Sequence, residues 1–132
     1  MRAWIAVATL LISMGLAACA STYSSKGAET LPADRIGILR HDYPFDSGYV
    51  IQEIDGRWRG VGVKTAYRLT PGIHSLGVIP HVPSFRGVKQ VRWFEVKPGR
   101  EYAVESAVDT DAVKWQFWII DRATGQRVDF TR

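Results

Sequence analysis

The stretch that most constrains the fold is residues 51–78, in which short strand-like segments are separated by two strong turn signals. Asp55-Gly56 is typical of a two-residue hairpin, because glycine adopts positive φ without a steric penalty and aspartate tolerates it. Pro71-Gly72 is typical of a type II turn, in which proline sets φ at the first corner and glycine supplies positive φ at the second. Because no segment shows helical periodicity over three turns, this stretch predicts antiparallel strands.

The same turn pattern returns later in the chain. Val96-Lys97-Pro98-Gly99 repeats the form of Leu69-Thr70-Pro71-Gly72, and an alternating strand follows each of them. We expect both to be hairpin corners, and we expect a last hairpin to turn at residues 122–125. About seven or eight short strands then fall within residues 35–132, which predicts an all-β fold, a single small antiparallel β-sandwich.

Length and composition support one domain that binds no nucleic acid. A chain of 132 residues has room for one core, and 46% hydrophobic content with five Trp, five Tyr and five Phe can fill it. Without Arg2, which lies in a segment expected to be removed, the 16 basic and 13 acidic side chains give a net charge of +3. These charges are scattered and form no basic run, so no nucleic-acid partner is expected.

Residues 1–18 have the parts of a secretory signal: a basic start with Arg2, an apolar run, and small residues before the cut. The apolar run is too short to be a comfortable membrane span. Leu16-Ala17-Ala18-Cys19 resembles the bacterial lipobox, in which the cysteine thiol receives a diacylglycerol and the cysteine becomes the new N-terminus. We therefore expect residues 1–18 to be a lipoprotein signal peptide and Cys19 to be the lipidation site.

This resemblance implies a location. Each buried CH₂ of a fatty acyl chain such as palmitate contributes about 0.8 kcal/mol, so several chains on Cys19 make an effectively permanent membrane anchor. Ala20, rather than Asp, follows Cys19, which in such lipoproteins is the pattern exported to the outer membrane. We expect the protein on the inner leaflet of that membrane, facing the periplasm. Residues 19–34, the lipidated Cys and a small, polar segment, are expected to form a flexible tether before the sandwich of residues 35–132.

The turn residues of the sandwich also resemble those of a known group. The pattern is similar to PEGA-like carbohydrate-surface modules and related small bacterial lipoproteins of unknown function. It is carried by Ile54-Asp55-Gly56, Tyr67, Leu69, Pro71-Gly72 and His74, and later by Phe94, Pro98-Gly99, Glu101-Tyr102, Trp115, Asp121 and Thr124-Gly125. The resemblance covers roughly residues 36–130 and implies an Ig-like β-sandwich rather than an activity.

The histidines do not form a metal-ligand pattern. His41, His74 and His81 are not spaced as a zinc site, and the only thiol is expected to be acylated, so no metal or cofactor is predicted. His74 shares a strand face with core residues and is expected to be a hydrogen-bonded structural histidine. His41 and Asp42 are neighbours that point to opposite faces of a strand, which disfavours a catalytic dyad.

Catalytic signatures are also missing from the sequence. There is no Gly-x-Ser-x-Gly elbow and no phosphate-binding loop, so no enzyme is predicted. Asp109 and Asp111 flank a turn, where aspartate favours local hydrogen bonds; calcium binding or acid–base chemistry is the alternative for them.

The tryptophans are the candidate binding residues. Trp93 and Trp118 alternate with core positions and should face away from the core. Together with Trp58, Arg57 and Arg59 they could form a partner-binding patch, since Trp and Arg dominate binding hot spots. Alternatively, their strands are central or covered by the loop at residues 80–87.

The function predicted from these features is a non-enzymatic, lipid-anchored accessory or protein-interaction module in the periplasm, with an unknown envelope protein as partner. A glycan- or peptidoglycan-binding module that uses exposed aromatic residues is the alternative, and a small hydrolase is the third hypothesis.

Overall fold

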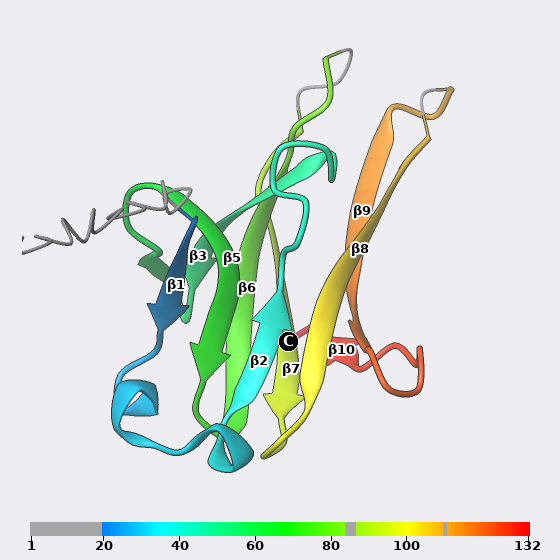
Figure 1. Cartoon of the computed structure of the whole chain (residues 1–132). Helices are drawn as coiled ribbons and strands as arrows, with labels where there is room; N and C mark the ends of the chain where they lie inside the picture. Colours follow the sequence, from blue (N-terminus) through cyan, green and yellow to red (C-terminus); the bar gives the residue numbers. More distant parts are fainter. Residues whose placement is uncertain (1–19, 84–86, 110) are drawn as a thin grey trace, which may run out of the picture.

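The fold is an all-β sandwich, as predicted (Figure 1). The described residues form two five-stranded sheets that include two parallel strand pairs, rather than seven or eight antiparallel strands. The computed structural model describes residues 20–83, 87–109 and 111–132. Sheet I has the order β1 (Ala20–Ser24), β5 (Val63–Leu69), β2 (Gly37–Arg40), β8 (Glu101–Asp109) and β9 (Lys114–Asp121). Sheet II has the order β10 (Asp129–Phe130), β7 (Gln90–Val96), β6 (Gly72–Pro80), β3 (Tyr49–Ile54) and β4 (Arg57–Trp58).

All odd-numbered strands run in one direction and all even-numbered strands in the other. The antiparallel pairs each join an odd to an even strand, while the two parallel pairs are β1 with β5 and β2 with β8. We call the end at which the odd strands begin the proximal end, because β1 starts there, and the other the distal end. The proximal end, the upper one in Figure 1, carries the described parts of four connections, residues 41–48, 59–62, 81–83 with 87–89, and 111–113.

The three predicted turns have different outcomes. Asp55-Gly56 is a two-residue hairpin as predicted, with φ of 54° and 73°, and it pairs Ile54 with Arg57. The prediction that Pro71-Gly72 and Pro98-Gly99 are hairpin corners is wrong. The first leads from β5 of sheet I to β6 of sheet II, and the second leads from β7 of sheet II back to β8 of sheet I. The local turn chemistry reverses the chain in either case, but packing of the two sheets decides which strand becomes the partner.

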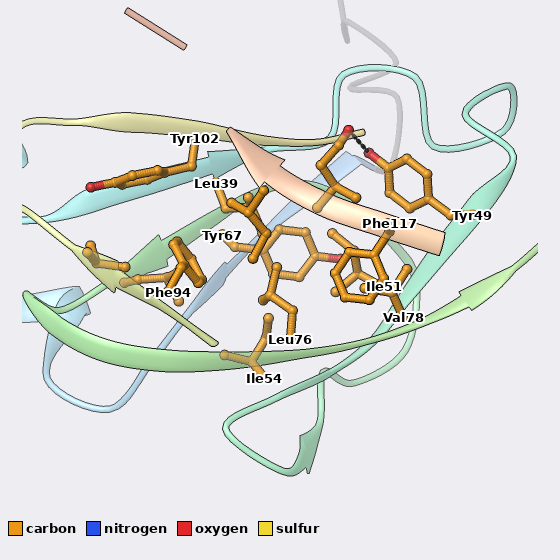
Figure 2. Packing of buried hydrophobic residues seen from close by; sticks show 14 of the residues in the cluster. Leu39, Tyr49, Ile51, Ile54, Tyr67, Leu76, Val78, Phe94, Tyr102 and Phe117 are labelled. Atoms are coloured by element: carbon orange, nitrogen blue, oxygen red, sulfur yellow. Dashed lines mark hydrogen bonds between the residues drawn. The ribbon is translucent and has the colours of Figure 1, made fainter. Parts of the chain in front are cut away.

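The core lies between the sheets, where inward-facing side chains alternate with outward-facing ones. Figure 2 shows how Tyr67 and Phe117 from sheet I pack toward Leu76 and Phe94 from sheet II. The Tyr49 hydroxyl donates to the Val104 carbonyl oxygen at 3.2 Å and so links the two sheets. The core cluster contains Leu39, Tyr49, Ile51, Ile54, Tyr67, Leu69, Leu76, Val78, Phe94, Val96, Tyr102, Val104, Trp115, Phe117 and Ile119.

Residues 20–34 do not form the predicted flexible tether. They contain β1, which pairs in parallel with β5, and two 3₁₀ turns, η1 (Ala28–Thr30) and η2 (Ala33–Arg35). Ser25 donates its N–H to the Arg68 carbonyl and accepts the Thr70 N–H on its hydroxyl. Small polar residues can satisfy the edge of β5 without any hydrophobic periodicity, which is why composition alone suggested a linker.

The described domain therefore begins at Ala20. The expected signal peptide and the lipidation site Cys19 lie outside the described residues. Within the described ranges, no helix is long and apolar enough to cross a membrane.

The last segment of the chain joins the two sheets at one side. After the turn at residues 122–125, Val128 donates its N–H to the Ile119 carbonyl, and the Asp129 carboxylate accepts the Ile119 N–H at 2.9 Å. Asp129 and Phe130 then pair with Phe94 and Trp93 of β7 as β10. The predicted hairpin therefore forms next to the turn, where residues 126–128 pair with β9, but the following residues pair with β7 of sheet II.

Candidate functional site

The five predicted patch residues do not lie together. Trp58 and Trp93 share the outer face of sheet II, where Trp58 is opposite Glu53 and Trp93 is opposite Ser75. Strands β3 and β6 separate them, and the Lys89–Glu53 salt bridge of 2.8 Å lies on the outer face between β7 and β4. Trp58 is 66% exposed, whereas Trp93 is half-buried beside Phe130. A polar bridge therefore interrupts the predicted patch.

The remaining members of the predicted patch have other surroundings. Trp118 lies on the outer face of sheet I, where its Nε1 donates to Glu105 Oε2 at 2.8 Å. The Arg59 guanidinium donates to the carbonyl oxygens of Ile51, Gly60 and Gly62, so it holds the bend before β5. Arg57 is exposed beside the Asp55-Gly56 turn. The outward orientation of the tryptophans was correctly predicted, but their sheets were not predictable from alternation.

Sequence reasoning missed a cleft between the starts of β7 and β9, which we call the β7–β9 cleft. Its volume is about 800 Å³, and its lining includes Val88, Val91, Arg92, Val108, Val113 and Trp115. Trp115 is only 5% exposed, and within the described part of the chain its indole Nε1 is buried without a hydrogen-bond partner. A buried donor without a partner is costly, so this N–H is an energetic weak point of the fold next to the cleft.

The edge of β9 explains why the cleft is open. The C-terminal segment pairs with the Ile119 and Asp121 half of β9. Toward the start of the strand, the Gln90 side chain instead donates to the Trp115 carbonyl oxygen at 2.7 Å. A side chain from β7 thus meets the strand edge where a further strand could pair with it. The sequence contained a signal for this site, because β7 begins with the polar residue Gln90 and β9, which begins at Lys114, is the most hydrophobic strand.

A second hollow of about 570 Å³ lies above β2, β8 and β9 and contains His41 and Ser47. The His41 ring stacks on Tyr49 with a centroid distance of 4.6 Å, and its Nε2 lies 2.8 Å from Ser47 Oγ. Ser47 Oγ donates to the Tyr49 carbonyl, so we assign the proton of the His41–Ser47 bond to His41 Nε2. His41 therefore donates to the serine rather than accepting its proton.

Burial keeps His41 neutral. Desolvation is the main cause that lowers the His41 pKa to about 4, and the nearby Arg59 charge lowers it further, against a smaller opposing effect of Asp42. Asp42 is exposed and lies 3.4 Å from the Arg122 guanidinium. Asp42, the carboxylate that follows His41 in the sequence, is therefore paired with Arg122.

His74 is the hydrogen-bonded structural histidine that was predicted. Its Nδ1 lies 2.7 Å from Asp55 Oδ2 and its Nε2 lies 2.6 Å from the Thr70 carbonyl oxygen. The other carboxylate oxygen of Asp55 accepts the Ser75 N–H at 3.0 Å. This buried ring thus links the Asp55-Gly56 turn to the connection between β5 and β6.

Asp109, at the end of β8, has the predicted local role. Asp109 Oδ1 accepts the N–H groups of Asp111 and Ala112, each at 3.1 Å, which shapes the turn before β9. Across the described ranges no group of three or more His, Cys, Asp or Glu side chains is arranged to hold a metal ion.

Comparisons with known proteins do not assign this chain to a family. No family model, curated protein or solved structure matches the chain. The resemblance to PEGA-like modules therefore stays a prediction.

Proposed function

We propose that this chain is a non-enzymatic, lipid-anchored interaction module of the bacterial cell envelope. Acylated Cys19 would hold it on the inner leaflet of the outer membrane, facing the periplasm. The lipobox-like sequence before Cys19 and the alanine after it support this placement. The well-packed sandwich that begins at the next residue is a suitable folded domain to follow such an anchor.

The β7–β9 cleft is the observation that carries the interaction hypothesis. Its valines and Trp115 offer apolar contact, and the Gln90 side chain, rather than a strand, meets the edge of β9 there. A protein segment suits such a site, since its apolar side chains can fill the cleft while its backbone pairs with the strand edge. The partner proposed is therefore an envelope protein that inserts apolar side chains at this edge.

The His41–Ser47 pair supports a non-enzymatic role. A serine nucleophile needs a neighbouring base that accepts its proton. Here the Ser47 hydroxyl donates to the Tyr49 carbonyl, and the stacked imidazole is held by packing on Tyr49. This geometry is that of a structural network.

In-cell photocrosslinking tests the interaction. A photoreactive residue at Gln116, an exposed position that lines the cleft, should capture a protein partner in intact envelopes. The matched control is Glu95, which is exposed on β7 and does not line the cleft. Equal capture at both positions, or no capture at Gln116, would contradict the cleft as the partner site.

Glycan binding is the second candidate, and the hollow above β2, β8 and β9 favours it. The Trp118 ring on the rim of that hollow is oriented by its bond to Glu105, and the Arg122 and Arg40 guanidinium groups lie nearby. Such a fixed aromatic ring among charged groups suits a sugar face and its hydroxyls. Titration with peptidoglycan fragments should change tryptophan fluorescence saturably in the wild type and not in Trp118→Ala, if this candidate is correct.

A further inference from the structure

Exposed apolar side chains gather at the proximal end of the sandwich. Of the eight large hydrophobic residues that are exposed in the described ranges, five lie in its connections. They come from all four connections, with exposed fractions of 69% to 85%: Tyr43, Phe45, Val61, Val88 and Val113. Single exposed hydrophobic residues are common on protein surfaces, but a group of them at one end is typical of a contact surface.

Two of these residues, Phe45 and Val61, lie beside the start of β1. Val63, two residues after Val61, is the register partner of Ala20. A side-chain carbon built on Gly62 would lie 3.9 Å from Ser21 Oγ. Phe45 lines a small cavity of about 210 Å³ together with Gly62 and Val63, and Tyr43 belongs to the same connection. The surface is therefore next to the point where the described chain begins.

The position of Cys19 decides what this surface meets. Cys19 immediately precedes Ala20, and β1 is already paired with β5 at Ala20. Consecutive Cα atoms are only about 3.8 Å apart, so no linker separates an acyl group on Cys19 from the sandwich. A lipid on that residue would bring the proximal end to the bilayer surface.

We propose that the proximal end is a bilayer-contacting face, whose tyrosine, phenylalanine and valine side chains enter the boundary between headgroups and acyl chains. This inference rests on the acylation of Cys19 in the proposed function. Tyrosine is favoured at such an interface because its ring is apolar and its hydroxyl remains hydrated. The strands then stand with one end on the membrane. Val88 and Val113 also line the β7–β9 cleft, so this cleft lies at the membrane surface.

The charges at this end indicate that the contact is apolar rather than electrostatic. Exposed carboxylates lie in the same connections, at Asp42, Asp46 and Asp111. Of the basic groups nearby, Lys89 binds Glu53 and Lys64 donates to Ser21 Oγ, while Lys114 is exposed at the start of β9. A face with both signs of charge has no strong preference for anionic lipids, so neutral lipid vesicles are a suitable probe.

Fluorescent labelling of the mature, acylated protein tests the proposal. A second cysteine at Val61 or Val88, both exposed, would carry an environment-sensitive fluorophore while acylated Cys19 stays unreactive. The matched control is Thr124→Cys, which is exposed in the turn at the distal end. In phosphatidylcholine vesicles, we expect blue-shifted emission and several-fold stronger quenching by spin-labelled lipid at positions 61 and 88 than at 124.

The outcomes separate this inference from the proposed function. One outcome is that the protein is acylated and bound to the vesicles, but the fluorophores at 61 and 88 show the same water-exposed emission as the one at 124. The proposed bilayer-contacting face would then be wrong, while the acyl anchor at Cys19 would be retained. If mass spectrometry finds no acyl group on Cys19, the anchor is wrong and the bilayer face fails with it.

Discussion

The two ends of the sandwich differ in how their side chains are used. At the distal end, polar side chains hydrogen-bond within the turns: His74 joins Asp55 to Thr70, and the Asp121 carboxylate accepts the Ala123 N–H. At the proximal end, longer connections leave Phe45, Val61 and their neighbours exposed. Both ends thus contain side-chain bonds that hold the fold, at His41 and Arg59 on the proximal side, but the proximal connections also leave apolar surface free for a contact. Substitutions at the two ends should separate stability from membrane association.

The largest effect is expected at the residue next to the proximal end. Cys19→Ala removes the thiol that would carry the acyl chains, so fatty-acid labelling should be lost completely and the protein should leave the membrane fraction. Metabolic labelling followed by envelope fractionation measures both. Label retained in the mutant would contradict the lipobox assignment.

The next largest effect is a dependence of folding stability on pH, which we expect from His41 at the start of the proximal connection 41–48. Burial lowers the His41 pKa from 6.5 to about 4, so the unfolded chain binds a proton first as the pH falls. Stability is therefore unaffected above pH 6.5, declines from pH 6.5 toward 4, and has lost about 3 kcal/mol below that range.

Urea unfolding at pH 7, 5 and 4 measures this loss. His41→Gln keeps a donor for Ser47 and does not titrate, so its free energy of unfolding should fall less than that of the wild type over the same range. An equal decline in both proteins would show that other groups cause the acid sensitivity.

At the distal end, His74→Ala should cost about 2 to 3 kcal/mol of folding free energy. It removes a buried ring and leaves the Thr70 carbonyl and one oxygen of the partly exposed Asp55 carboxylate without their partner. Chemical unfolding at pH 7 measures the change. A cost below about 0.5 kcal/mol would mean that the ring does not hold the two turns together.

The smallest change in stability is expected at the proximal surface. Phe45→Ser and Val61→Ser alter side chains that are 78% and 76% exposed, so each should change the free energy of unfolding by less than about 0.5 kcal/mol. A larger loss in the protein free of lipid would show that these side chains pack within the fold and would weaken the contrast between the two ends.

Local chemistry predicted the features that depend on nearest neighbours. The Asp55-Gly56 turn needs two positive φ values, the alternation of β9 separates Trp118 from the core, and His74 lies between bonding partners close in the fold. These features follow from side-chain period and turn stereochemistry. The candidate site was less predictable, because the cleft arises from how the edges of β7 and β9 are spaced after the C-terminal segment crosses between the sheets.

The sequence by itself therefore determined an all-β chain with outward-facing tryptophans, a structural histidine at position 74 and a lipobox-like stretch ending at Cys19. Only the tertiary structure decided that Ala20–Ser24 pairs with β5, that the two Pro-Gly turns cross between sheets, and that the predicted patch lies on two opposite faces. The physical reason is that strand pairing and sheet packing depend on contacts between residues far apart in the chain. A turn or an alternating pattern sets the local direction of the backbone and leaves the partner open.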